Sequence, residues 1–412
     1  MRAVLSVLTR HRDFRRLFFA ELVVFGGDWF AVIPLMALLL DLTGMGLWGS
    51  LALAADTGAL ALLLPYAGTI ADRFDRRKIL IVTSIAALLA VVVLLAVRSP
   101  GVAWLGVLAI GMLGAAKAFY TPAALAALPN LVPREDLATA NAIAGSAWGT
   151  MLVVGASLGG VMAALVGPYI TFGITAVCLV AATVLVWLIR TPMQADRTTE
   201  PTPALTALRE ALGYIRRHPR VLSLVTVKSA VGVGNGVLAT FPLLAASFGV
   251  GAMGSGFLFA ARGLGALVGP FLMRRLLATR ALLLPLLAIS MGIYGLAYLG
   301  VALSPWYALT LILVVVAHIA GGGNWMTSNF ALQLEVPDEL RGRIFATDMM
   351  IATLAVSLSL LVVGALVDVL DVRVLIGAAA SATLLYAIVW RIATRKYELG
   401  SPVSQAAGPG TS

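Results

Sequence analysis

Long apolar runs alternate with short charged segments along this chain. Each of twelve runs approaches or exceeds the roughly 20 residues that a helix needs to cross a bilayer. The runs cover residues 17–40, 47–66, 79–97, 102–122, 138–166, 169–189, 221–248, 255–273, 281–299, 305–328, 344–367 and 374–392. The pattern predicts an all-α integral membrane protein with twelve transmembrane helices.

Lysine and arginine residues gather on one side of these runs. Of the 29 basic residues, all but five lie in the terminal segments or in the loops on the same side as the termini. The exceptions are Arg98 and Arg373, in loops on the other side, and Lys117, Lys228 and Arg262, inside spans. Because basic loops stay in the cytoplasm, we expect both termini to be cytoplasmic in a multi-pass protein of the cytoplasmic membrane. The net charge of +10 then reflects topology, and no nucleic-acid partner is expected.

One polar stretch divides the spans into two sets of six. Between the sixth and seventh runs, Gln194, Asp196, Arg197 and Glu200 follow one another closely. We expect an N-terminal bundle at residues 1–190, a cytoplasmic linker at 191–220, a C-terminal bundle at 221–392 and a disordered cytoplasmic tail at 393–412.

Within the linker, apolar residues recur at helical spacing. Leu205, Leu208, Leu212 and Ile215 share one face, and the arginines lie off that face. This pattern predicts an amphipathic helix on the membrane surface. A helix that binds a partner protein is the alternative.

The two halves repeat each other at a shift of 207 residues. The shift aligns Gly27-Asp28 with Gly234-Asn235, Gly58 with Gly265, Gly114 with Gly321, Lys117 with Asn324 and Asn141 with Asp348. The repeat predicts two six-helix bundles of the same architecture that meet at a common interface.

A charged island between the second and third spans carries the most specific motif. It reads Gly68-Thr-Ile-Ala-Asp72-Arg73-Phe-Asp75-Arg76-Arg77-Lys78. This segment resembles the signature loop of the major facilitator superfamily of transporters, in a form similar to that of its drug, macrolide and siderophore exporters. Asp75 departs from the broad family pattern, which has glycine there. The alternative is an ordinary basic cytoplasmic loop.

The resemblance implies two pseudo-symmetric six-helix bundles and a cytoplasmic gate in this loop. The implied gating residues are Gly68, Asp72, Arg73, Arg76 and Arg77. Asp72 would accept hydrogen bonds from a basic residue of the loop and face the N-terminus of the eleventh helix, where the helix dipole favours an anion.

Two further family motifs are incomplete. In the fifth span, Gly155, Gly159 and Gly160 resemble a glycine-rich antiporter motif and are expected to pack helices closely. Ala156 stands where that motif has proline, which weakens the inference of export. Leu108 stands where the fourth helix of the family carries a basic residue.

Polar residues inside the spans are the candidate site, because a charge near the bilayer centre costs about 2.5–3.5 kcal/mol unless it finds a partner or water. Counting about 1.5 Å per residue sorts them by depth. Asp28, Asp56, Arg262, Asn235 and His318 are expected near the midplane, and Glu21, Lys117, Tyr120, Lys228, Asn324 and Asp348 nearer the cytoplasm. The resemblance implies that spans 1, 4, 7 and 10 line a central cavity.

These depths predict the charge pairs. Glu21 and Asp348 are expected to neutralise Lys117 and Lys228. Asp28 and Asp56 are expected to share a single cation, Arg262, which leaves one carboxylate in excess. A spare carboxylate in the membrane favours uptake of a proton, so Asp28 is the first choice for proton coupling. The alternative for Asp28 is a hydrogen bond to the backbone of a glycine-loosened helix, and for His318 a packing role.

The sequence contains no motif for ATP binding, metal binding or catalysis. There is no phosphate-binding loop of the form Gly-x-x-x-x-Gly-Lys-Ser/Thr, so ATP is not the expected energy source. The resemblance implies a proton gradient instead. Three histidines and one cysteine form no metal-ligand spacing, and no cofactor or enzymatic activity is expected.

The resemblance implies a monomeric secondary transporter that exports small amphipathic organic molecules by proton antiport with alternating access. The expected partners are the substrate, protons and the lipid bilayer. One alternative is proton-coupled or facilitative uptake, or lipid translocation, on the same fold. The other is a membrane sensor or scaffold that transports nothing.

Overall fold

The computed structural model describes residues 2–194, 203–273 and 283–397. Its elements are α1 (Arg2–Arg10), α2 (Arg12–Thr43), α3 (Leu47–Arg73), α4 (Arg76–Leu94), η1 (Pro100–Val102), α5 (Ala103–Leu131), α6 (Arg134–Val166), α7 (Pro168–Trp187), α8 (Ala204–Arg217), α9 (Pro219–Gly234), η2 (Asn235–Thr240), α10 (Phe241–Ser247), α11 (Gly251–Met273), α12 (Leu283–Leu303), α13 (Tyr307–Glu335), α14 (Asp338–Leu366) and α15 (Val372–Thr394). Twelve helical segments of this described chain are long and apolar enough to cross a membrane, which confirms the predicted all-α membrane fold. Most of the predicted tail lies outside the described residues.

Several helices extend beyond the apolar runs that predicted them. The fourth span, expected to end at residue 122, continues as α5 to Leu131, and the tenth continues as α13 to Glu335. Apolar length is set by the bilayer, whereas backbone hydrogen bonding continues through polar turns beyond it. The apolar pattern therefore locates the membrane better than it locates the helix ends.

The seventh span is interrupted rather than continuous. α9 ends at Gly234, a 3₁₀ segment covers Asn235–Thr240, and α10 resumes at Phe241 with Pro242 in its first turn. Proline has no N–H group, so one α-helical hydrogen bond is lost at Pro242. Proline alone does not account for the break, because α2 stays helical through Pro34. The equivalent helix of the other half, α2, has no such 3₁₀ break.

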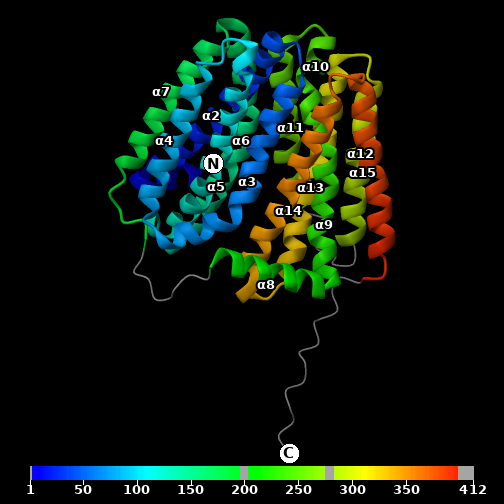
Figure 1. Cartoon of the computed structure of the whole chain (residues 1–412). Helices are drawn as coiled ribbons and strands as arrows, with labels where there is room; N and C mark the ends of the chain where they lie inside the picture. The colour runs from blue at the N-terminus through cyan, green and yellow to red at the C-terminus, as the bar shows by residue number, and fades with distance from the viewer. Residues whose placement is uncertain (1, 195–202, 274–282, 398–412) are drawn as a thin grey trace, which may run out of the picture.

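Each half shows the same pattern of helix neighbours, seen in Figure 1 as two adjacent groups. α3 packs on α5 as α11 packs on α13, α4 packs on α7 as α12 packs on α15, and α2 packs on α6 as α9 packs on α14. Between the halves, α3 packs on α14 and α6 packs on α11. These pairings follow the order expected from the sequence repeat.

The halves are closest at the end away from the linker. In α6, a Cβ on Gly160 would lie only 2.8 Å from the carbonyl oxygen of Ala252 in α11. Between α3 and α14, the Ser357 hydroxyl donates to the Ala54 carbonyl at 2.8 Å, and the N–H of Gly46 donates to Asp368 at 2.6 Å. We call these contacts the distal seam.

The linker helix α8 lies across the opposite end of the C-terminal bundle (Figure 1). Its buried residues, Ala211 and Ile215, join an apolar cluster with Leu224 and Ile344, and Glu210 forms an ion pair with Arg343 of α14. The amphipathic helix was predicted correctly, but its apolar face covers protein rather than lipid. Leu205, assigned to that face, is exposed.

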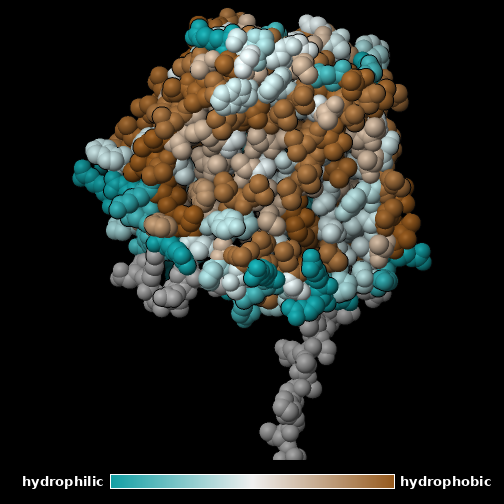
Figure 2. Space-filling view, viewed as in Figure 1, coloured by the Kyte–Doolittle hydropathy of each residue, from teal (hydrophilic) through white to brown (hydrophobic). Residues whose placement is uncertain are grey.

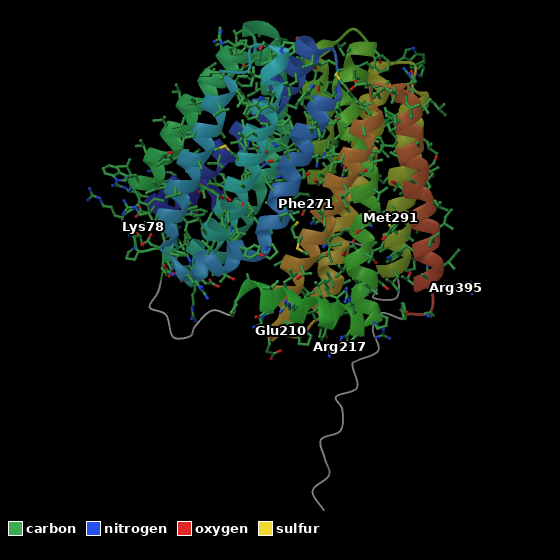
Figure 3. All side chains as sticks on the ribbon, viewed as in Figure 1. Lys78, Glu210, Arg217, Phe271, Met291 and Arg395 are labelled. Atoms are coloured by element: carbon green, nitrogen blue, oxygen red, sulfur yellow. The ribbon has the colours of Figure 1, made fainter. Side chains whose placement is uncertain are left out.

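The surface separates apolar and charged regions. Figure 2 shows hydrophobic side chains around the middle of the molecule and hydrophilic ones gathered toward the end that carries α8. Lys78, Glu210, Arg217 and Arg395 lie toward this end in Figure 3. The apolar middle fits a bilayer, and the molecule is a multi-pass membrane protein.

We expect Gly160→Ala to destabilise the protein by about 1–3 kcal/mol, because the new Cβ would overlap the backbone of α11. The measurement is the melting temperature of the purified protein in detergent. Gly173→Ala in α7 is the matched control, since a Cβ there meets no atom within 4 Å. Equal melting temperatures of the two variants would contradict close packing of α6 on α11.

Candidate functional site

One lysine joins three helices of the N-terminal half. The Nζ atom of Lys117, in α5, lies 2.7 Å from Oδ2 of Asp28 in α2. It also lies 2.8 Å from Oδ1 and 3.0 Å from Oδ2 of Asp56 in α3. Both carboxylates are buried, and the lysine side chain is only 13% exposed. We call Asp28, Asp56 and Lys117 the acid pair cluster.

This arrangement corrects the predicted pairs. The prediction paired Lys117 with Glu21 and placed Asp28 and Asp56 opposite Arg262. In the structure, both aspartates form ion pairs with Lys117 instead. Residue counting measures depth along each helix separately, whereas the relative height of neighbouring helices depends on how they tilt and pack. An error of about one turn, roughly 5.4 Å, is enough to exchange partners.

Gly114 makes the acid pair cluster possible. A Cβ at this position would lie 2.3 Å from the backbone oxygen of Asp56 and 2.8 Å from its Oδ1. Only glycine therefore lets α5 approach α3 this closely, one turn before Lys117. In the sequence, Gly114 lies one turn before Lys117 within the fourth span, and this spacing could have indicated a close helix contact beside the lysine.

The acid pair cluster holds more acid than base. Two carboxylates share one ammonium group, and Oδ1 of Asp28 is buried without a hydrogen-bond partner in the described part of the chain. Adding one proton to either aspartate would remove the surplus negative charge and leave the lysine paired with the other. The cluster is therefore chemically suited to bind and release a single proton.

Glu21 lies two turns earlier in α2 and stands apart from the cations. Its side chain is 4% exposed, and no ion pair or hydrogen bond joins it to another described residue. Tyr120 of α5 is its electrostatic neighbour, and the buried Tyr120 hydroxyl also lacks a partner among the described residues. The two groups form a second acidic position on the same side of the interface.

The C-terminal half contains a buried ion pair of one lysine and one aspartate. Lys228 of α9 is fully buried, forms an ion pair with Asp348 of α14, and donates to Asn329 of α13 at 2.7 Å. Its ammonium also lies 5.1 Å from the centre of the Trp325 ring. This is the pair that depth along the helices predicts, and it joins three helices as Lys117 does in the other half.

Three predicted cavity residues are engaged within the C-terminal half. His318 and Tyr298 share a hydrogen bond of 2.9 Å, Asn235 accepts from Tyr294 at 3.0 Å, and Asn324 donates to Ser290 at 2.9 Å. All three partners belong to α12. These contacts favour the packing role for His318.

Arg262 of α11 differs from the other intramembrane cations. Its guanidinium lies 5.9 Å from the centre of the Trp29 ring in α2, across the boundary between the halves. Within residues 2–194, 203–273 and 283–397, no carboxylate forms an ion pair with it. It is a cation facing the interface without a counter-ion.

The loop predicted to act as a gate is anchored to its own half. Arg76 donates to the carbonyl oxygens of Ala126 at 2.6 Å and Met193 at 3.1 Å, and Arg77 donates to that of Trp187. Asp75 starts α4 by accepting from the N–H of Lys78 at 3.0 Å, which explains an acidic residue in place of glycine.

Asp72 does not form the expected contact in this conformation. Its side chain is exposed and accepts no hydrogen bond from Arg73, Arg76 or Arg77 in the described structure. Gly68 has open space at the Cβ position. The hydrogen bonds of the distal seam between α3 and α14 lie toward the other end of both helices, and no described residue of the C-terminal half pairs with the Asp72 side chain.

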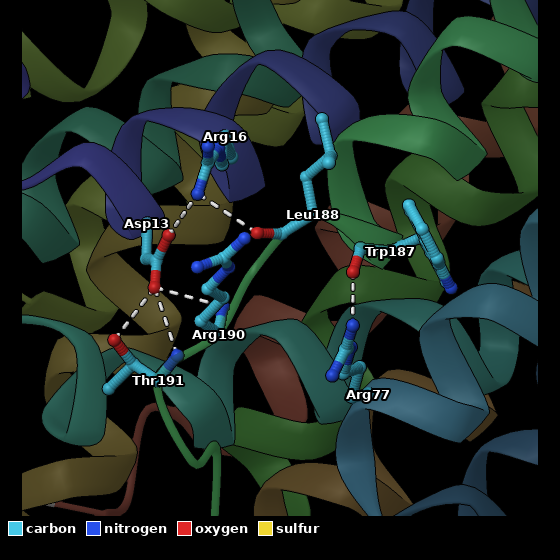
Figure 4. A network of polar contacts seen from close by, with 7 residues as sticks. All are labelled: Asp13, Arg16, Arg77, Trp187, Leu188, Arg190 and Thr191. Carbon is cyan, nitrogen blue, oxygen red and sulfur yellow. Dashed lines mark hydrogen bonds and ion pairs between the residues drawn. The ribbon is translucent and has the colours of Figure 1, made fainter.

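Figure 4 shows how the same end of the N-terminal half is tied together. Asp13 at the start of α2 accepts from Arg16 at 2.7 Å and from the N–H and hydroxyl of Thr191 at 2.9 and 2.7 Å. Arg77 reaches the end of α7 beside this network. The start of α2, the end of α7 and the gating loop therefore form one unit.

The glycines of the fifth span contact two different helices. Cβ atoms on Gly155 and Gly159 would lie 3.4 Å from Trp29 Cβ and 3.0 Å from its backbone oxygen, both in α2. Gly160 instead lies against α11 in the distal seam. The glycine run thus brings α6 close to its own bundle and to the opposite half.

The chain is similar to known transporters throughout its length. The family model described as Major Facilitator Superfamily matches residues 17–346 and 235–409. The enterobactin exporters EntS of Salmonella typhimurium and Escherichia coli O81 are 26% identical over 365 and 375 residues, with 82% of each chain covered.

Solved structures share the fold at lower identity. An auto-inhibited peptide transporter of the POT family superposes with a TM-score of 0.73 at 13% identity, covering 96% of this chain and 99% of that one. A bacterial homolog of the human lysosomal transporter Spinster, inward-facing and unoccupied, gives 0.70 at 16% identity, covering 95% and 99%. The chain belongs to the Major Facilitator Superfamily and is a membrane transporter rather than an enzyme.

Proposed function

We propose that this protein exports small amphipathic organic molecules across the cytoplasmic membrane in exchange for protons. The observation that carries the proposal is the acid pair cluster, which buries two carboxylates around one ammonium group at the helices that face the interface. The likeness to proteins named as enterobactin exporters supports the outward direction. The proton gradient supplies the energy, and neither ATP nor a cofactor takes part.

The arrangement of the two halves supports alternating access. The distal seam closes one end of the interface, and the basic loops lie at the other end. With both termini in the cytoplasm, as the charge distribution predicts, the closed end is external and the conformation faces inward. Export then requires the distal seam to open while the cytoplasmic ends of the halves approach each other.

The acid pair cluster is connected to the distal seam through α3. Asp56 lies two residues after Ala54, whose carbonyl oxygen accepts the hydrogen bond from Ser357 of the other half. A proton on Asp56 would remove its attraction to Lys117 and free α3 to shift against α14. Proton binding at Asp28 and Asp56 would thereby change the stability of the closed outer end.

Charge balance gives the sequence of events. The unprotonated cluster carries one surplus negative charge, and protonation makes the site neutral. We infer that the protein returns from the outward to the inward conformation in the protonated form. Release of the proton inside then restores the charged cluster for the next substrate.

We expect Asp28→Asn to abolish substrate-dependent proton flux, because the asparagine amide does not take up a proton at the pH of the assay. The assay uses purified protein in liposomes that contain a pH-sensitive dye, with a panel of lipophilic dyes, macrolides and siderophores. Asp41→Asn is the matched control, since Asp41 is an exposed residue of the same helix. Proton flux of wild-type size in Asp28→Asn would remove Asp28 from the coupling mechanism, and substrate movement without any proton flux in the wild type would indicate a uniporter.

We expect Gly114→Ala to reduce the coupled flux at least tenfold while the protein remains folded. The added Cβ would push Asp56 away from Lys117, since it would meet both the backbone and the carboxylate of Asp56. Gly111→Ala is the control in the same helix, because its Cβ would lie 3.5 Å from that of Ala55, an ordinary contact distance. Equal flux in the two variants would show that the approach of α5 to α3 is not required.

We expect Asp72→Asn to shift the conformational balance toward the inward-facing state. The Asp72 side chain forms no hydrogen bond or ion pair with a described residue in the present conformation, so we assign its contribution to the state in which the cytoplasmic ends meet. Spin labels on the cytoplasmic ends of α3 and α14 would measure this distance distribution, with Asp41→Asn as the control for loss of a carboxylate. An unchanged distribution would leave the loop without a gating role.

A further inference from the structure

Of the three cations that lie deep within the spans, Lys117, Lys228 and Arg262, only Arg262 has no ion pair with a described acidic side chain. Lys117 is held by Asp28 and Asp56, and Lys228 is held by Asp348. The guanidinium of Arg262 has neither an ion pair nor a hydrogen bond to any described residue. An isolated charge at this depth is costly, so its retention needs a reason beyond packing.

The groups that surround Arg262 supply no negative charge. Tyr294 and Tyr298 of α12 and His318 of α13 are its electrostatic neighbours within the C-terminal half. Tyr298 is hydrogen-bonded to His318, and Tyr294 donates to Asn235. None of these partners can act as a counter-ion in its neutral form, and the guanidinium remains available to another group.

Arg262 also lies beside aromatic side chains at the boundary between the halves. The Trp29 ring of α2 faces it at 5.9 Å and packs on Phe259 at 5.5 Å between ring centres, and Phe259 packs on Phe241 at 5.0 Å. Trp29 and Arg262 belong to different halves. Their contact therefore lies on the boundary where a substrate passes in a two-bundle transporter.

We propose that Arg262 binds an oxyanion, such as a carboxylate or sulfonate, on an aromatic substrate whose ring packs against Trp29. A guanidinium offers paired N–H groups that match two oxygens of such an anion, and a neighbouring aromatic ring favours a flat apolar body. The assignment rests on the proposed export function and names the class of molecule that the site accepts.

Two probes of the same shape and different charge test the proposal. Naphthalene-2-sulfonate and naphthalene-2-sulfonamide share one ring system, and only the first is anionic at neutral pH. Binding to the purified protein in detergent is measured by equilibrium titration of tryptophan fluorescence and by the shift in melting temperature, without any pH gradient. We expect the sulfonate to bind at least tenfold more tightly than the sulfonamide.

Variants then assign that preference to Arg262. Arg262→Gln should bring the two affinities within twofold of each other, and Arg262→Lys should keep a reduced preference for the anion. Arg391→Gln, which removes a cation from α15, should leave the preference unchanged. Equal affinity of the wild type for both probes, or an undiminished preference in Arg262→Gln, would overturn the proposal.

The result is separable from the test of proton exchange. Binding at equilibrium needs neither a gradient nor Asp28, so a preference for the anion that depends on Arg262 stands even where proton flux is absent. Conversely, coupled flux of other substrates with no preference for the anion would keep the transport function and remove the role of Arg262.

Discussion

A charge in the hydrocarbon layer requires a nearby opposite charge, and this requirement organises both halves of the molecule. Lys117 meets it by joining α2, α3 and α5, and Lys228 meets it by joining α9, α13 and α14. Each lysine thus fixes the relative height of three helices within one bundle. The two differ in charge balance: Lys228 is paired with one acid, whereas Lys117 is shared by two, so one acid of the second arrangement can accept a proton while the lysine stays paired with the other.

The route from the acid pair cluster to the distal seam is short because both lie on α3. Asp56 binds the lysine, and Ala54 one half-turn earlier accepts the hydrogen bond that crosses to α14. The glycines of α6 provide the corresponding close contact with α11. Since these contacts use backbone and small side chains, they can separate without exposing large apolar surfaces, as the proposed alternating access requires.

The spans, the overall charge distribution and the Lys228–Asp348 pair can be predicted from the sequence. Bilayer thickness and depth along a helix depend only on position along the chain, which the sequence supplies directly. The partners of Lys117 could not be predicted in this way, because they depend on the close approach of α5 to α3 that Gly114 allows. The surface that α8 covers could not be predicted either, since an amphipathic face fits lipid and protein equally well, and Ala211 and Ile215 cover the bundle. The break at Asn235–Thr240 carried no specific signal, because α2 stays helical through its own proline, Pro34.

The unpaired guanidinium of Arg262 has a consequence for energetics. An exchanger that carries a monovalent anion outward on this residue and one proton inward on the acid pair cluster moves two elementary charges in each cycle. The membrane potential, negative inside, acts on both movements in the same direction, at about 2.3 kcal/mol per charge for each 100 mV. Such a transporter is electrogenic, and voltage alone would sustain export in a cell whose internal and external pH are equal.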